Sequence, residues 1–180
     1  MFSIQNPVKE PESFALIRFQ DCDPFGHLNN ARYLDYFLNA RQDQIAQHYN
    51  LRTYEPDKAR EGSWVVRKTQ IAYLKPARVM EEVLIRTRLI HFNATSLVVE
   101  GLMFDKNGRH LKAIIWFEFV YISLATGKPL DHPDELMHLF QSVVIADDFE
   151  PNGFNRQVEI ARRQHRSRVE NQETTAVATA

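Results

Sequence analysis

The chain has a single cysteine, Cys22, among its 180 residues. One thiol excludes an internal disulfide, and it excludes metal sites built on paired cysteines such as C-x-x-C. Long apolar runs are also missing, because the most apolar region, 111–125, contains Lys112 and Glu118 and is too short to span a bilayer. The N-terminus lacks the basic start and unbroken apolar stretch of a secretory signal. We therefore expect a cytoplasmic protein that does not enter a membrane.

An excess of charge of one sign is missing too. The 22 Lys and Arg residues nearly balance the 23 Asp and Glu residues, so the formal net charge is −1. The molecule as a whole thus offers no electrostatic footprint for nucleic acid. Hydrophobic residues make up 44% of the chain, which is enough for the core of one compact domain and not of two.

Turn signals and hydrophobic spacing predict a strand and then a long helix. Prolines among polar residues mark 1–13 as a lead-in, and the residues 14–19 that follow are β-prone. From Asn30 the apolar spacing becomes helical and predicts a helix to about Tyr49. Either Asn29 or Asn30 suits the cap of this helix. The residues at helical spacing are Leu34, Phe37, Leu38, Arg41 and Ile45.

Four segments with strand character follow the helix. They are 64–74, 83–90, 97–104 and 111–124. Between the last two, Asn107-Gly108 is a strong hairpin signal. These strands are long enough to curl around the helix, so the expected fold class is α+β, a long central helix wrapped by a curved antiparallel sheet of about five strands.

The remainder of the chain predicts a second, C-terminal helix and then a tail. Pro133 suits a first helical turn, and apolar residues at helical spacing follow it as far as Val143. The domain therefore covers 14–145, and 146–180 is a polar, partly disordered tail. Within the tail, the charge of 155–168 favours a solvated helix.

The junction between the first strand and the long helix carries the family resemblance. Segment 18–33, RFQDCDPFGHLNNARY, resembles the hotdog-fold thioesterases, in particular the 4-hydroxybenzoyl-CoA thioesterase-like branch. Segment 71–78, IAYLKPAR, is similar to the family's second strand, which ends in a Tyr-x-x-Pro turn. The resemblance covers roughly 14–145. It implies the hotdog fold, hydrolysis of an acyl-CoA thioester to free acid and CoA without a metal or other cofactor, and a homodimer or homotetramer.

The same resemblance implies the catalytic residues. In the pattern D-x-D-x-x-G-H-x-N-N, the family's carboxylate falls on Asp23 and its oxyanion-binding amide on Asn30. Thioester hydrolysis needs such a carboxylate, as nucleophile or general base, and donors for the developing oxyanion. His27 is the third candidate, because it can orient Asp23 or a water. Asp23 before a proline is also a common Asx turn, and a loop histidine is often bonded to backbone, so these interpretations stay open.

Basic and aromatic side chains are the candidates for substrate contacts. The cations available to the phosphates of CoA are Lys75, Arg78, Arg86 and Arg88. The residues predicted to line the acyl group between subunits are Tyr33, Phe37, Val65 and Phe92. The turn 91–96 lacks the basic cluster that the family often carries there, so acyl carrier protein is an alternative donor.

Other functions compete with acyl-CoA hydrolysis. A non-catalytic acyl-ligand binding or assembly module would keep the same fold without turnover. Cys22 is a minor candidate nucleophile, although a lone cysteine at a strand end is usually a small apolar residue. A dehydratase generally needs a histidine within the long helix, and there only His48 is available, near the helix end.

Overall fold

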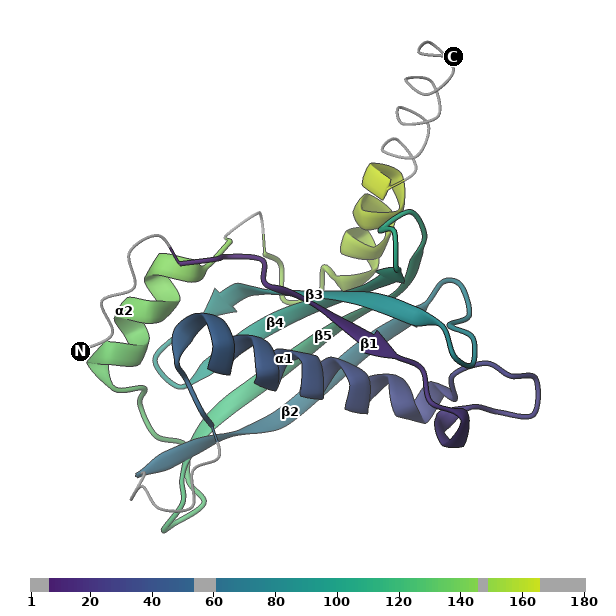
Figure 1. The fold of residues 1–180 in the computed structure, drawn as a ribbon. Coiled ribbons are helices and arrows are strands. Elements are labelled where there is room, and N and C mark those ends of the chain that lie inside the picture. The colour runs from purple at the N-terminus through teal and green to yellow at the C-terminus, as the bar shows by residue number, and fades with distance from the viewer. Residues whose placement is uncertain (1–6, 54–60, 146–148, 166–180) are drawn as a thin grey trace.

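The structure is a computed structural model that describes residues 7–53, 61–145 and 149–165. A long helix lies across one face of a five-stranded antiparallel sheet, here the inner face (Figure 1). The strands are β1 (Glu12–Leu16), β2 (Gly62–Tyr73), β3 (Glu82–Phe92), β4 (Ser96–Asp105) and β5 (Leu111–Ser123). The helices are α1 (Tyr33–Tyr49) and α2 (Asp134–Val143), with short 3₁₀ turns η1 (Phe19–Asp21) and η2 (Asn30–Arg32). This arrangement confirms the predicted hotdog fold. No helix in the described ranges is both long and apolar enough to cross a membrane.

The strands are ordered β1-β3-β4-β5-β2 across the sheet. β2 therefore crosses to the far edge and pairs with β5, although β3 follows it in the sequence. The predicted hairpin at Asn107-Gly108 joins β4 to β5, and Gly108 has a φ of 66°, which glycine adopts without strain. The sheet thus has two edges, β1 and β2.

Phe37 seats α1 on the sheet. Its side chain is fully buried and lies against Gly101 of β4. A Cβ atom at position 101 would lie 2.7 Å from Phe37 Cδ1 and 2.8 Å from Ile115 Cγ2. The missing side chain therefore lets the helix approach the strand closely, and the largest apolar cluster of the inner face forms around this contact.

The first strand is shorter than the sequence predicts. Of the predicted strand 14–19, only the part up to Leu16 is extended, and Phe19–Asp21 turns into η1. The reason is the partner strand: Leu16 pairs with Glu82, the first residue of β3, and Ile17 still hydrogen-bonds to the backbone of Glu81 and Met80. The regular ladder ends there, because Met80 has a φ of 60° and is not extended. At its other end β1 begins at Glu12, within the predicted lead-in.

A C-terminal helical segment covers the outer face of the sheet. Side chains alternate along β5, so that Ile115 and Phe117 face α1, whereas Ile114 and Trp116 belong to the outer cluster. Residues 154–165 are helical and add their apolar side to that cluster. The buried residues are Phe154, Val158 and Ala161. The sequence predicts a solvated helix here, but spacing of i, i+4 and i+7 gives these three residues one common face. Residues 171–180, predicted to be disordered, lie outside the described ranges.

His132 holds the segment before α2 against β2 and the turn between β3 and β4. Its Nε2 accepts a hydrogen bond from Trp64 Nε1 at 3.0 Å, and its Nδ1 lies 3.1 Å from the carbonyl oxygen of Asn93. Because an indole N–H only donates, the ring is neutral with its proton on Nδ1. Burial lowers the pKa of His132, since the charged form would lose its hydration.

We predict that His132 makes the protein less stable as the pH falls. Above the ordinary pKa of about 6.5 the side chain is neutral in both states. Below that value the unfolded chain takes up the proton first, so the free energy of unfolding decreases until the pH passes below the folded-state pKa. Urea unfolding of the wild type and His132→Gln across this window measures the effect. A stability difference between the two proteins that stays constant with pH would contradict the prediction.

Gly101→Ala is expected to destabilise the fold by about 1–3 kcal/mol, because the added methyl group overlaps the buried ring of Phe37. The measurement is the free energy of unfolding in urea. Gly127→Ala is the matched control for the loss of glycine, since its Cβ would meet no atom within 4 Å and its cost comes from its φ of 67° alone. A stable Gly101→Ala protein would mean that α1 can shift on the sheet.

Candidate active site

The ten residues 21–30 form a tight loop that starts at the last residue of η1 and ends at the first residue of η2. Cys22 and Leu28 pair across it, and Leu28 is buried, 2% exposed, with its N–H donating to the carbonyl oxygen of Ala77 at 2.8 Å. A second contact joins the carbonyl oxygen of Gly26 to the N–H of Val79 at 2.9 Å. The loop is therefore held against the connection between β2 and β3.

One oxygen of the Asp23 carboxylate organises this loop. Its Oδ1 accepts hydrogen bonds from the N–H of Phe25 at 2.9 Å and of His27 at 3.0 Å. This is the Asx turn that the proline-flanked sequence suggests. The carboxylate is partly exposed, and Oδ2 has no hydrogen-bond partner among the described residues. The turn thus orients Asp23 and leaves its second oxygen available.

The beginning of the long helix offers an unpaired amide. The α-helix begins at Tyr33 and not at the predicted Asn30, and Arg32 at its N-cap makes no side-chain capping bond. Residues 30–32 form η2, and Asn29 caps this turn, because its Oδ1 accepts from the N–H of Ala31 at 3.0 Å. In the part of the chain that the structure describes, the N–H of Asn30 has no acceptor, while its carbonyl oxygen accepts from the hydroxyl of Tyr73 at 2.9 Å. A free N–H at a helix start carries partial positive charge and suits an oxyanion.

His27 meets Asp23 through the backbone. Its N–H donates to Asp23 Oδ1, its carbonyl oxygen accepts from the N–H of Asp23 at 2.8 Å, and its backbone pairs with Arg78. Its imidazole makes no hydrogen bond within the described ranges. The ring is therefore free to turn toward a substrate or a water, and it does not orient the carboxylate in this structure.

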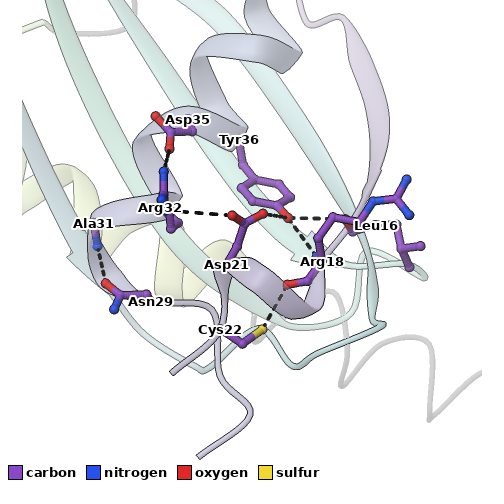
Figure 2. Close-up of polar contacts among 9 residues, drawn as sticks. All are labelled: Leu16, Arg18, Asp21, Cys22, Asn29, Ala31, Arg32, Asp35 and Tyr36. Carbon is purple, nitrogen blue, oxygen red and sulfur yellow. Dashed lines mark hydrogen bonds and ion pairs between the residues drawn. The ribbon is translucent and has the colours of Figure 1, made fainter. Parts of the chain in front are cut away.

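Asp21 connects the loop to α1, as Figure 2 shows. Its Oδ2 accepts from the Tyr36 hydroxyl at 2.9 Å, and that hydroxyl in turn accepts from the N–H of Arg18 at 2.9 Å. Arg32 Nε lies 3.8 Å from Asp21 Oδ1. Burial raises the pKa of Tyr36, so the phenol stays protonated as a donor. Asp21 thereby supports the site, and both of its oxygens are engaged.

The environment of Cys22 disfavours it as a nucleophile. Its thiol donates to the carbonyl oxygen of Arg18 at 3.4 Å (Figure 2). Desolvation, and then the charges of Asp21 and Asp23, raise the pKa of this thiol. A raised pKa decreases the fraction of thiolate, which is the reactive form.

The predicted substrate residues fall into two groups. Tyr33 and Phe37 are buried in the core, 2% and 0% exposed, and the Tyr33 hydroxyl accepts from the N–H of Ala77 at 3.2 Å. In this single chain Tyr33 and Phe37 therefore belong to the core beneath the loop, in the same cluster as Leu28. Lys75 and Arg78 are exposed near the loop, and Lys75 Nζ lies 3.0 Å from His110 Nδ1.

The other candidates differ in availability. Arg86 and Arg88 are engaged with the carboxylates of Glu12 and Glu100. Val65 is 43% exposed on the edge strand β2. Phe92 packs against Phe140 of α2, with ring centroids 5.6 Å apart.

Two contributions to the site had little signal in the sequence. Tyr73 was visible only as part of the Tyr-x-x-Pro turn, and its bond to Asn30 depends on how β2 lies beside α1. Phe19, just before the loop, and Phe25, within it, are 80% and 83% exposed and give it apolar surface that no periodicity predicts.

Comparisons with known proteins agree with this architecture. The family model of the thioesterase-like superfamily matches residues 17–140. The long-chain acyl-CoA thioesterase FadM of Escherichia coli (strain K12) is 27% identical over 128 residues, which cover 71% of this chain and 95% of FadM.

Solved structures share the fold at lower identity. A DHNA-CoA thioesterase from Staphylococcus aureus has a TM-score of 0.66 and 19% identity, covering 74% of this chain and 87% of its own. The 1,4-dihydroxy-2-naphthoyl-CoA thioesterase Slr0204 from Synechocystis has a TM-score of 0.65 and 14% identity, covering 71% and 93%. With the family model spanning most of its length, this chain belongs to the thioesterase-like superfamily, the group of thioester hydrolases that its loop and its fold predict.

Proposed function

We propose that the protein hydrolyses acyl-CoA thioesters, with Asp23 and the Asn30 amide as its catalytic groups. The observation that supports this proposal is the pattern of paired and unpaired polar groups in the loop 21–30. One carboxylate oxygen of Asp23 is fixed by two backbone amides while the other is unpaired, and the N–H of Asn30 is unpaired in the same loop. The name of the relative FadM, a long-chain acyl-CoA thioesterase, supports the substrate class.

The chemistry follows from these two groups. Asp23 Oδ2 either attacks the carbonyl carbon of the thioester or removes a proton from a water that attacks it. The carbonyl oxygen gains negative charge, which the N–H of Asn30 stabilises together with the partial charge of the helix start. The carbon–sulfur bond then breaks and CoA leaves as a thiolate that takes up a proton. On the nucleophile route a water next hydrolyses the acyl–Asp23 anhydride, so both routes give one acid and one CoA.

Lys75 and Arg78 are the proposed contacts for the phosphates of CoA. Both are exposed cations on the connection against which the loop is held. Arg86 and Arg88 are less suitable, because carboxylates already neutralise them. His27 lies beside Arg78 in the same backbone bridge, so its free imidazole is the proposed third group near the thioester.

Asp23→Asn is expected to decrease kcat/KM for acyl-CoA roughly 100- to 10,000-fold without loss of the fold. An asparagine Oδ1 still accepts from Phe25 and His27, so the loop keeps its shape while the basic carboxylate is lost. The measurement is thiol release from short, medium, long and aromatic acyl-CoAs, with the unfolding midpoint as the check on folding. Asp21→Asn is the matched control, because it changes a carboxylate two residues away that is engaged with Tyr36.

An unchanged rate in Asp23→Asn would remove this carboxylate from the mechanism. No thiol release from any acyl-CoA by the folded wild type would contradict acyl-CoA hydrolysis. Release from acyl carrier protein would then identify the alternative donor, and binding of acyl-CoA without release would identify a non-catalytic module.

We also propose that the protein forms a homodimer along β2. The mass of the species in solution distinguishes this dimer from a tetramer. Among the described strands, β2 pairs only with β5, so the other side of its backbone is an open edge. Val65 and Val66 are both 43% exposed on this edge. A partner here would lie beside Tyr73 and the start of α1, where the thioester is proposed to bind.

A double substitution, Val65→Lys with Val66→Lys, is expected to convert the dimer to a monomer, because lysines on an open edge repel a second strand. Light scattering after size-exclusion chromatography gives the mass of each species. Leu124→Lys is the control, since Leu124 is an exposed apolar residue beyond the end of β5. A monomeric wild type would contradict the proposal.

A further inference from the structure

Arg41 is a cation on the side of α1 that faces the sheet. It lies four residues after Phe37 and four before Ile45, and both of these are buried in the clusters under the helix. Residues spaced by four share one side of a helix. The guanidinium therefore enters the layer between α1 and the sheet, where the other side chains are largely apolar.

The contacts of Arg41 leave its charge without a counterion. Its Nη1 donates to Thr87 Oγ1 at 3.1 Å, and its guanidinium carbon lies 5.8 Å from the ring centroid of Tyr49. Burial lowers the pKa of Arg41, which marks a poorly hydrated cation. No carboxylate of the described residues forms an ion pair with it.

Two other cations of low exposure in this protein do have carboxylate partners. Arg88 Nε lies 2.7 Å from Glu100, a residue that is 1% exposed. Lys112, 7% exposed, has its Nζ 2.8 Å from Glu81. Arg41, which is partly buried, differs from these two cations, and removing a charge from water even in part without a partner is costly.

A cavity of about 180 Å³ adjoins Arg41, between the C-terminal half of α1, the sheet and α2. This volume corresponds to about six water molecules. The walls are mostly apolar, and the cavity-lining residues within the described ranges include no Asp or Glu. Apolar members of the wall are Leu38, Ile45, Trp64, Val99, Phe119 and Phe140. The polar members beside Arg41 include Gln42 and Thr53, which are hydrogen-bonded to each other.

This combination selects one kind of ligand. An apolar chain would fill the cavity, and a single negative charge at its end would supply the missing counterion of Arg41. A phosphate group fits less well, because it carries more charge and Arg41 is the sole cation among the described residues of the wall. We propose that this cavity binds a carboxylate carried on an apolar chain, and that Arg41 is the residue that recognises it.

Two sources can supply that carboxylate. One is a free fatty acid. The other, which rests on the proposed thioesterase function, is the far end of a substrate acyl group that carries a second carboxylate. Arg41 follows Asn30 by eleven residues, about 16 Å along a helix axis. β2 runs back along the same side, from Trp64 at the cavity to Tyr73 at Asn30, so the cavity and the thioester site lie along one flank of α1.

Direct binding tests the site without any thioester chemistry. Trp64 lies in the cavity wall, so its fluorescence reports binding of octanoate or of the neutral analogue octan-1-ol at about pH 8, where His132 is neutral. We expect octanoate to bind at least tenfold more tightly than octan-1-ol, a difference of about 1.4 kcal/mol. Arg41→Met should abolish this preference, and Arg41→Lys should restore part of it.

Controls separate this result from loss of structure. Trp64→Phe should remove the signal, and Lys106→Met, which neutralises an exposed cation in the β4–β5 turn, should leave the preference unchanged. If Arg41→Met is poorly folded, the preference for octanoate over octan-1-ol is compared between the wild type and Arg41→Lys, and this comparison tests the proposal. Equal binding of octanoate and octan-1-ol by the wild type, or a preference that survives in folded Arg41→Met, would overturn the proposal.

Hydrolysis distinguishes the two sources. Thioesters of CoA with monocarboxylic and dicarboxylic acids, from octanoyl to hexadecanoyl length, are compared in the wild type and Arg41→Met. A decrease in kcat/KM of tenfold or more for the dicarboxylic series alone identifies the far end of the substrate as the ligand. Octanoate binding that needs Arg41, without such a decrease, identifies a free fatty acid. If no thioester is hydrolysed but octanoate still binds through Arg41, the proposed function fails and this site stands.

Discussion

The contact of Phe37 with Gly101 determines how closely α1 lies on the sheet, and both ends of the helix take their positions from it. Toward the N-terminus, the close approach brings Asn30 to Tyr73 and Tyr33 to Ala77, so the loop 21–30 is held on two sides. Toward the C-terminus, it brings Arg41 against Thr87 of β3. Because the helix is rigid, this one packing contact fixes the positions of both Asn30 and Arg41.

Much of the fold was predictable because its signals are local. Alternation, a strong Asn-Gly turn and helical spacing predicted β4, β5, α1 and α2 to within a few residues. The end of β1 was not predictable, because it depends on where β3 begins to offer partners. The strand order had the same limit, since pairing β2 with β5 is a non-local choice. In 154–165, three apolar residues among many charges were too few to signal burial, although their spacing matches the outer face.

The candidate site shows what sequence reasoning can and cannot separate. An Asx turn and a reactive carboxylate are competing interpretations of Asp23 in the sequence, yet its two oxygens allow both at once. The sequence left the cap of the long helix open between Asn29 and Asn30, whereas in the structure Asn29 caps η2, the turn that precedes α1, and the next amide is unpaired. The bond of Asp21 to Tyr36, fifteen residues away, required the helix to fold against the loop. The sequence shows Arg41 at helical spacing with apolar residues. It does not show that Arg41 lacks a carboxylate partner, because that depends on which residues lie near it in the folded chain.

The helical segment 154–165 limits the ways in which whole molecules can associate. With α1 on the inner face and this segment on the outer face, both broad surfaces of the sheet are occupied within one chain (Figure 1). Stacking two sheets through their outer faces would first require the displacement of Phe154, Val158 and Ala161 from the apolar cluster they complete. Of the sheet's surfaces, its two edges are then the ones left for pairing with another molecule without such a displacement.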